Sequence, residues 1–258
     1  MSQILVCMKA VPLATDSVGG SDLQLDREKI NLQWSPSDES ALEAALRLKG
    51  ENGSVTVLSM GPQKLMGTLQ DLFGRGVDNA VLLTDPAMAG ADTHATAKAL
   101  AAAVRNLGEF DLILCGRRSM DGETGQVPGM LAAALGYSCV TDAECLQETE
   151  QGIHASRLMA FGSATVELQL PAVISVCEYS YHLRLPGILG RRKAKNKQVQ
   201  LLSAMDIGLD PGQCGLRGSL TKVVRAQHGA PGLRKGPKET DITVAAKKIL
   251  QLCREVWE

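Results

Sequence analysis

Short apolar runs alternate with longer Ala- and Leu-rich segments through the first half of the chain. The runs at residues 4–8, 54–60, 79–83 and 112–115 have the length and composition of buried strands. Helical spacing follows at residues 38–48, 63–73, 93–107 and 126–135. Ser37 or Asp38 can cap the first of these helices, and Gly50 is expected to terminate it. This alternation predicts βαβ units, and therefore a mostly parallel, twisted sheet flanked by helices.

The pattern changes in three places. Residues 23–34 alternate apolar and polar positions and predict a hairpin excursion. Similar alternation within 141–178, ending in the apolar run 172–176, predicts antiparallel strands. Gly, Pro and charged residues dominate 209–237, and helical spacing returns at 242–257. We therefore predict an α/β domain at residues 1–200 and an extended C-terminal arm with a helix at 201–258 that packs on another protein.

Composition narrows the class of protein. The chain has 258 residues, of which 45% are hydrophobic and 21% charged, as in ordinary globular proteins. A formal charge of -1 provides no overall field for nucleic acid or an anionic membrane. The seven cysteines form no C-x-x-C pair and most lie in apolar runs, which indicates reduced thiols. With no signal-peptide pattern and no apolar run of about 18 residues, we predict a cytoplasmic protein without direct membrane insertion.

The most informative segment for chemistry is the loop at residues 116–126, between a predicted buried strand and a predicted helix. Open α/β sheets bind ligands at this carboxyl edge. Glycines in the loop allow backbone N–H groups to approach a phosphate, and a helix beginning near Thr124 adds a positive dipole end. The alternative is a flexible connection with a turn at Asp121-Gly122. Residues 34–38 also open a helix at a chain reversal and could face the same crevice.

Other candidate sites are weaker. Residues 17–22, Ser-Val-Gly-Gly-Ser-Asp, resemble the glycine loop of ATP pyrophosphatases, but a strand pattern follows where that motif needs a helix. The four histidines have neither i, i+4 pairing nor nearby cysteines, so no metal site is predicted. The sequence contains no G-x-S-x-G, H-E-x-x-H or P-loop motif. Catalysis by the chain's own side chains is therefore disfavoured.

Residues 179–205 contain no Asp or Glu. The apolar segment Leu185-Pro186-Gly187-Ile188-Leu189 is followed there by basic residues, among them Arg191, Arg192 and Lys193. Such a run is often only a solvated surface, and the few aromatic residues argue against stacking on single-stranded nucleic acid. An apolar turn beside positive charge predicts a protein-docking element.

Several segments in fixed order resemble the β subunit of electron transfer flavoproteins, including the FixA-type bacterial members. The most specific is Asp121-Gly122-Glu123-Thr124-Gly125-Gln126-Val127. The others are Ile4-Leu5-Val6-Cys7-Met8-Lys9 with Val11-Pro12, Ser35-Pro36 before Glu43-Ala44-Ala45-Leu46-Arg47-Leu48-Lys49, Leu58-Ser59-Met60-Gly61-Pro62, Ala97-Lys98-Ala99-Leu100-Ala101, Leu170-Pro171-Ala172-Val173-Ile174, and Leu185-Pro186 with Lys193-Ala194-Lys195.

The resemblance implies an adenine-nucleotide-binding, Rossmann-like fold and a non-catalytic subunit. Its partner would be an α subunit that carries FAD, with a flavin-linked dehydrogenase as electron donor. The crevice would hold AMP, or a second FAD as in electron-bifurcating members. The resemblance implies that Leu185 is the anchor for docking, beside Arg191, Arg192 and Lys193 of the basic run. The implied nucleotide contacts are Cys7, Ser35, Pro36, Ser37, Asp38, Met60, Asp121, Gly122, Glu123, Thr124, Gly125, Gln126 and Val127.

The chain also departs from the family pattern. Ser35-Pro36-Ser37 stands where Asn-Pro-Phe is common, and Arg117-Arg118 where Lys-Gln is usual. Residues 180–184, Ser-Tyr-His-Leu-Arg, replace the usual Asn-x-Pro-Arg-Tyr. AMP and FAD therefore stay open as alternatives. A freestanding ATP-binding enzyme or sensor of the same fold is the rival interpretation, but it lacks a recognisable γ-phosphate or metal ligand set and leaves the arm unexplained.

Overall fold

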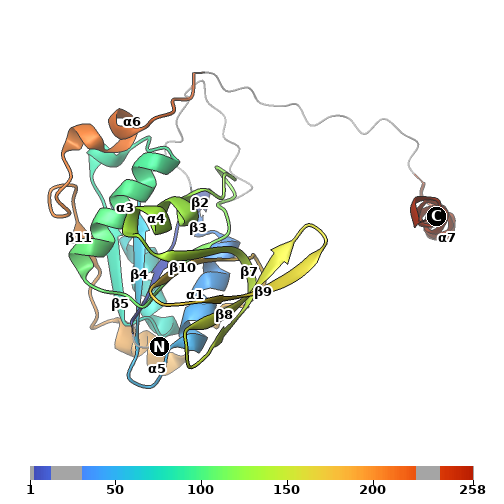
Figure 1. Cartoon of the computed structure of the whole chain (residues 1–258), viewed down its shortest axis with the longest axis horizontal. Helices are drawn as coiled ribbons and strands as arrows, with labels where there is room; N and C mark the ends of the chain where they lie inside the picture. Colours follow the sequence, from blue (N-terminus) through green and yellow to red (C-terminus); the bar gives the residue numbers. More distant parts are fainter. Residues whose placement is uncertain (1–2, 13–30, 225–238, 258) are drawn as a thin grey trace. The chain divides into compact units, whose positions relative to one another are not determined.

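The computed structural model describes residues 3–12, 31–224 and 239–257 (Figure 1), apart from the side chains of residues 193 and 255–257. Internal contacts divide the chain into two compact units, Met1–Val223 and Val224–Glu258. The first unit contains the sheet and all the candidate site residues, and the second contains one helix.

A nine-stranded sheet forms the centre of the first unit, in the order β11-β5-β4-β1-β6-β10-β7-β8-β9. Every pairing from β11 to β7 is parallel, and β8 and β9 continue the sheet antiparallel. This confirms the predicted fold class. The strands are β1 (Gln3–Cys7), β4 (Ser54–Met60), β5 (Asn79–Leu83), β6 (Leu112–Gly116), β7 (Ser138–Glu148), β8 (Ile153–Met159), β9 (Gly162–Leu168), β10 (Ala172–Val176) and β11 (Gln200–Leu202).

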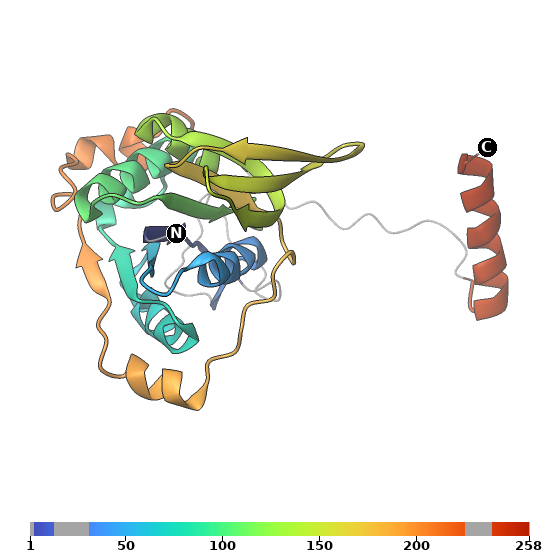
Figure 2. The same ribbon diagram turned by 60° about the horizontal axis from the view of Figure 1, so that its bottom comes forward.

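Helices cover both faces of the sheet (Figure 2). Because successive side chains of a strand point to opposite faces, Leu112 and Leu114 of β6 join one core cluster while Ile113 and Cys115 join the other. The first cluster packs against α1 (Pro36–Leu48) and α2 (Met66–Leu72), and the second against α3 (Thr93–Leu107) and α4 (Val127–Leu135). The helix predicted at 63–73 consists of α2 flanked by the 3-10 turns η1 (Gln63–Leu65) and η2 (Phe73–Arg75).

Strand β10 corrects the sequence interpretation, because it is parallel to both β6 and β7. All five of its residues are buried. A strand that is covered on both faces needs a continuous apolar run, so this run signalled a central parallel strand. The antiparallel prediction holds for β7, β8 and β9. The β8–β9 hairpin projects from the body of the sheet (yellow in Figure 1).

The predicted hairpin excursion falls only partly within the described residues. Its second arm contributes β3 (Leu32–Trp34), which pairs antiparallel with β2 (Ala10–Pro12) in a separate two-stranded sheet. The rest of the excursion, and the glycine loop at residues 17–22, lie outside the described residues.

The first unit extends past residue 200, where the sequence placed the domain boundary. Strand β11 pairs with β5 at the edge of the sheet, and Leu202 and Ala204 are buried in the core. The following chain contains the 3-10 turn η4 (Pro211–Gln213) and α6 (Gly215–Gly218). Asp92, which caps α3, accepts hydrogen bonds from the backbone N–H and hydroxyl of Thr221. Residues 201–223 therefore belong to the α/β unit.

The second unit contains α7 (Ile242–Trp257), at the predicted position. The side chains of Ile249, Leu250 and Leu252 on this helix are each about 60% exposed. No helix in the described ranges is both long and apolar enough to cross a membrane.

Candidate functional site

A topological switch point lies between β1 and β6. The chain leaves β1 through β2, β3 and α1 on one face, and it leaves β6 toward α4 on the opposite face. Two neighbouring parallel strands whose connections diverge in this way leave a crevice beyond their carboxyl ends. Cys7 and Cys115, the paired residues near these ends, lie side by side beneath it.

A buried carboxylate joins three elements at this crevice. The Oδ2 atom of Asp38, in the first turn of α1, accepts a hydrogen bond from the backbone nitrogen of Lys9 at 2.7 Å. Its Oδ1 atom accepts one from the backbone nitrogen of Gly116 at 2.9 Å. Gly116 has no side chain to obstruct this contact, and an added Cβ would lie only 2.7 Å from the backbone nitrogen of Asp38. Asp38 therefore fixes the start of α1 against the ends of β1 and β6.

The protonation of Asp38 is sensitive near neutral pH. Burial raises the pKa of this carboxyl from 3.8 to about 7, while the backbone donors of Lys9 and Gly116 and the charge of Lys9 act in the opposite direction. The side chain is 6% exposed, so little water solvates its ionised form.

Lys9 lies across the crevice from β1 to the loop after β6. Its Nζ atom is 2.7 Å from Oδ1 of Asp121 and 3.2 Å from Oγ of Ser119. The Lys9 side chain is 38% exposed. The sequence interpretation did not include Lys9 or Ser119 among the site residues. A lysine directly after a buried strand was the available signal for Lys9.

The loop from β6 to α4 contains the most specific predicted residues. Asp121 Oδ1 also accepts a hydrogen bond from the backbone nitrogen of Gly122 at 2.8 Å. Asp121 and Gly122 lie in a turn, as considered from the sequence, and the backbone nitrogen of Glu123 donates across it to the oxygen of Ser119 at 2.9 Å. Glu123 and Gly125 have left-handed backbone conformations, with φ of 48° and 63°. Gly122, Glu123 and Thr124 are exposed. Helix α4 begins at Val127 with Gln126 as its N-cap, one residue after the start of the predicted segment 126–135 and three residues after Thr124, where its amino end was expected.

The two serines before Asp38 also contact this loop. Oγ of Ser37 donates to the backbone oxygen of Arg118 at 2.7 Å, and it lies 3.1 Å from Oγ of Ser35. Both serines are buried. Neither Ser37 nor Asp38 caps α1 as the sequence predicted, because the helix begins at Pro36 with Ser35 as N-cap and without a side-chain capping bond. The side chains that resembled a cap instead attach the helix to the β6 loop.

Salt bridges hold the start of the same loop. Nε of Arg117 is 2.6 Å from Oδ1 of Asp142, and its backbone nitrogen donates to the oxygen of Val176 at 2.8 Å. Glu178 lies 3.9 Å from Arg117 and 3.8 Å from Arg118. These contacts tie the β6 loop to the carboxyl end of β10.

The remaining predicted nucleotide residues lie at the same edge. Cys7 ends β1, and Met60 ends the neighbouring β4. A hydrogen bond with Cys7, together with burial, raises the pKa of Cys115 well above its ordinary value. The structure thus brings Cys7, Met60 and the segments 35–38 and 121–127 to one edge of the sheet.

The predicted docking residues lie elsewhere. Leu185, Ile188 and Leu189 are 84%, 82% and 72% exposed, and Arg191 and Arg192 are also exposed. The apolar segment is not only a turn, because α5 (Ile188–Ala194) begins within it. Helix α5 packs against η2, which precedes the amino end of β5, so this surface lies away from the carboxyl edge (Figure 1).

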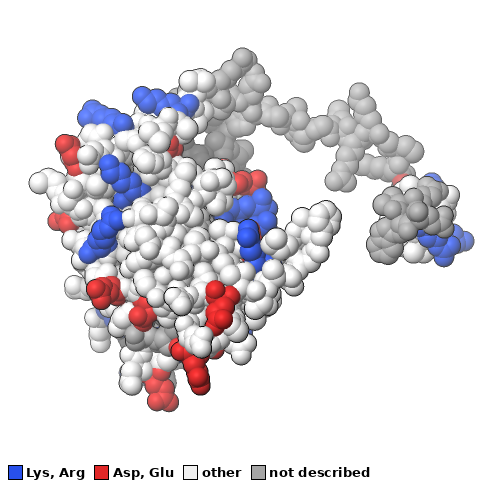
Figure 3. Space-filling model, in the orientation of Figure 1, with Lys and Arg blue, Asp and Glu red and all other residues white. Residues whose placement is uncertain are grey.

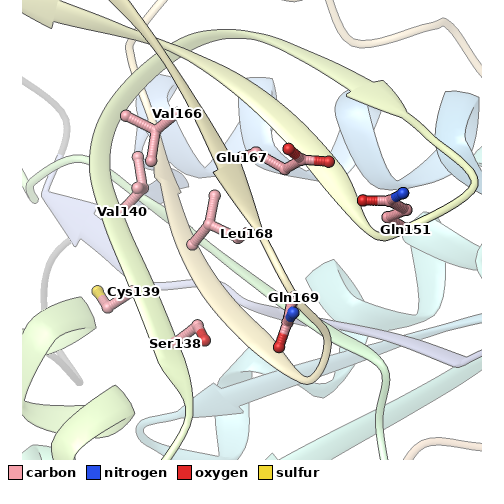
Figure 4. A pocket seen from close by; sticks show the side chains of 8 residues that line it. All are labelled: Ser138, Cys139, Val140, Gln151, Val166, Glu167, Leu168 and Gln169. Atoms are coloured by element: carbon pink, nitrogen blue, oxygen red, sulfur yellow. The ribbon is translucent and has the colours of Figure 1, made fainter.

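A hollow of about 610 Å³ lies between β7 and β9 (Figure 4). It begins at Ser138, which pairs with Ala172 at the amino end of β10, and is therefore at the opposite edge of the sheet from the crevice. Its lining contains no Lys or Arg, and its one charged side chain is that of Glu167. This chemistry does not suit a phosphate-bearing ligand.

Charge is mixed on the face of the molecule drawn in Figure 3, with basic side chains mainly in its upper half and acidic side chains mainly in its lower half. Among the described residues, no group of three or more His, Cys, Asp or Glu side chains is arranged to hold a metal ion. Fold and site together define a Rossmann-like α/β protein whose polar groups converge on a switch-point crevice.

Comparison with known proteins identifies the family. The electron transfer flavoprotein domain matches residues 22–206. The electron transfer flavoprotein subunit beta of Thermoanaerobacterium thermosaccharolyticum is 37% identical over 224 residues, which is 86% of each chain. That of Megasphaera elsdenii is 36% identical over 230 residues, 86% of this chain and 85% of that protein. Subunit CarD of the caffeyl-CoA reductase–Etf complex of Acetobacterium woodii is 35% identical over 227 residues, 87% of each. The chain belongs to the electron transfer flavoprotein family as a β subunit, an electron-transfer subunit and not a catalytic enzyme.

Proposed function

We propose that this β subunit binds AMP in the β1–β6 crevice and assembles with an α subunit whose FAD carries the electrons. A flavin-linked dehydrogenase would deliver those electrons after docking on the Leu185–Arg192 surface. The observation that carries the nucleotide assignment is the convergence of Lys9, Asp38, Gly116 and the 121–127 loop at one switch point. A second FAD is the alternative occupant.

The residues present suit a phosphate-bearing ligand. The ammonium group of Lys9 supplies positive charge, and Ser119 and Thr124 supply hydroxyl groups on the loop. The exposed backbone of residues 122–124 and the amino end of α4 can supply further N–H donors. Gly125 gives this backbone a conformation that few other residues adopt. A bound FAD in the partner would supply reversible one- and two-electron chemistry, while this chain orients and assembles.

Assembly with the α subunit is supported by α7. The apolar side chains of Ile249, Leu250 and Leu252 would gain about 1.5–3 kcal/mol each on full burial against the partner. This is the part of the predicted 201–258 arm that we assign to the partner interface. Family membership also argues against the freestanding ATP-binding enzyme or sensor. All seven cysteines are free, three of them exposed, which supports placement in the cytoplasm.

The nucleotide assignment is tested on the heterodimer purified from its native host. Acid extraction and mass spectrometry should release AMP in about equal amount to the β subunit. Gly125→Val should lower that content, because a β-branched residue is strained at a φ of 63°. Gly67→Ala, on α2 away from the loop, where an added Cβ meets nothing within 4 Å, is the matched control. A fully assembled heterodimer without any nucleotide would contradict the proposal, and FAD in the extract would favour the alternative.

A further inference from the structure

The exposed docking surface is attached to the core through one buried carboxylate. Glu43, in the middle of α1, is 3% exposed. Its Oε1 atom accepts hydrogen bonds from Nε of Arg47 at 3.0 Å and from a terminal nitrogen of Arg184 at 3.0 Å. Its Oε2 atom accepts from Nε of Arg184 at 2.9 Å and from the backbone nitrogen of Arg184 at 3.1 Å. Both oxygens are therefore satisfied.

The contact between Glu43 and Arg184 fixes the position of the main chain as well as pairing the two charges. Arg184 binds Glu43 in the bidentate manner, which sets the orientation of the guanidinium plane. The additional bond from the Arg184 backbone fixes the main chain directly before Leu185. Arg47 also lies 5.3 Å from the centre of the Tyr181 ring. The hydroxyl of Ser40, in the same helix, donates to the backbone oxygen of Tyr181 and accepts from its backbone nitrogen.

The attachment continues on the other side of the segment. Arg75 of η2 donates to the backbone oxygen of Arg184 at 2.6 Å. Gly190 of α5 packs against the backbone of Gly74, at a distance that leaves no room for a Cβ. Gln70 of α2 donates to the backbone oxygen of Lys197 at 2.7 Å. A segment with three highly exposed apolar side chains is thus held at both ends by α1 and the α2–η2 turn.

Ionisation of Glu43 suits this role. Burial by itself would raise the pKa of Glu43, but hydrogen bonds from Arg184 and Arg47 outweigh that effect and hold the pKa below its ordinary value. The carboxylate therefore stays charged at neutral pH and keeps both arginines as partners. Glu43 is buried while both arginines are partly exposed, so loss of both arginines would leave an unpaired buried carboxylate.

We propose that Glu43 is a positioning residue for electron delivery, which holds the segment 184–194 so that Leu185, Ile188 and Leu189 are presented in a fixed arrangement to the donor dehydrogenase. This rests on the proposed docking role of that segment. Pre-ordering matters because each long side chain or loop segment ordered during association weakens binding. Loss of the Glu43 contact should therefore weaken docking without touching the flavin.

The experiment uses the intact heterodimer and its native dehydrogenase. Glu43→Gln keeps the shape of the side chain but removes its charge, and we expect kcat/KM for the dehydrogenase to fall about tenfold with little change in kcat. Reduction of the flavin by dithionite and the nucleotide content should stay at wild-type values. Hydrogen exchange at residues 184–190 should become faster. Arg184→Lys, at a half-exposed side chain, gives the same test if Glu43→Gln folds poorly. Glu109→Gln, at an exposed site before β6, is the control.

A double-mutant cycle distinguishes positioning from a merely structural effect. If Glu43 acts by presenting the apolar side chains, Glu43→Gln should add little to the defect of Leu185→Ala with Ile188→Ala. If the defects in kcat/KM multiply in the combined variant, the positioning role of Glu43 is wrong. It is also wrong if Glu43→Gln leaves hydrogen exchange at residues 184–190 unchanged. If the apolar variants alone leave kcat/KM unchanged, the proposed docking surface itself fails, whatever Glu43→Gln does.

Discussion

Asp38 should make the stability of the chain depend on pH in an unusual direction. The pKa of this carboxyl is about 7 in the folded chain and about 3.8 when unfolded. Between these values the folded state keeps a proton that the unfolded state has lost. Stability is therefore fully present below about pH 4 and is lost as pH rises toward 7, opposite to the behaviour of a salt-bridged carboxylate.

The magnitude follows from that difference of about three pH units, at about 1.4 kcal/mol for each, or about 4 kcal/mol in all. Asp38→Asn removes the ionisation but can accept through only one oxygen. One of the two backbone donors, Lys9 or Gly116, then loses its partner, at a cost of about 1–3 kcal/mol. The variant should thus be less stable than wild type at pH 5 and closer to it, or more stable, at pH 8.

The assay is urea unfolding of both proteins at several pH values between 5 and 8. For each protein the free energy of unfolding is plotted against pH. The difference between the two plots reports the ionisation of Asp38, because the other titrating groups are common to both proteins. We expect the free energy of unfolding of wild type to fall by roughly 2–3 kcal/mol relative to Asp38→Asn between pH 5 and 7. Parallel curves over that range would refute the reasoning and place the pKa of Asp38 near its ordinary value.

Three further perturbations test other parts of the molecule. Gly116→Ala should lower the free energy of unfolding by about 1–3 kcal/mol in urea titrations, because the added methyl group overlaps the Asp38 turn, whereas Gly67→Ala, in open space on α2, should be neutral or stabilising. Arg191→Glu with Arg192→Glu should slow association with the dehydrogenase by about tenfold at low ionic strength, and stopped-flow rates that ignore salt would show a surface without a docking role. Ile249→Asp with Leu252→Asp on α7 should release the chain from its α subunit in size-exclusion chromatography, and an unchanged elution volume would remove α7 from the interface.

The sequence predicted most elements of the first unit because each has a strong local signal. The strands β4 and β5 and the helices α3 and α7 begin and end at the predicted residues. Their spacing, apolar runs and caps are local properties, so they can be determined without knowing what packs against them. The loop at 121–127 likewise became the candidate centre of the site from its glycines and its position between a strand and a helix, and its role stays a prediction.

Only the tertiary structure decided which polar groups meet. Asp38 resembled a helix cap in the sequence, but its carboxylate bonds to residues at the ends of two strands, one of them 78 positions away. The residues around Glu43 likewise do not indicate its partner Arg184, which is 141 positions away. Strand β10 likewise takes its parallel direction from the strands on either side of it. Pairings of this kind depend on the order of strands in the sheet, which is a property of the whole chain and leaves no local pattern in the residues themselves.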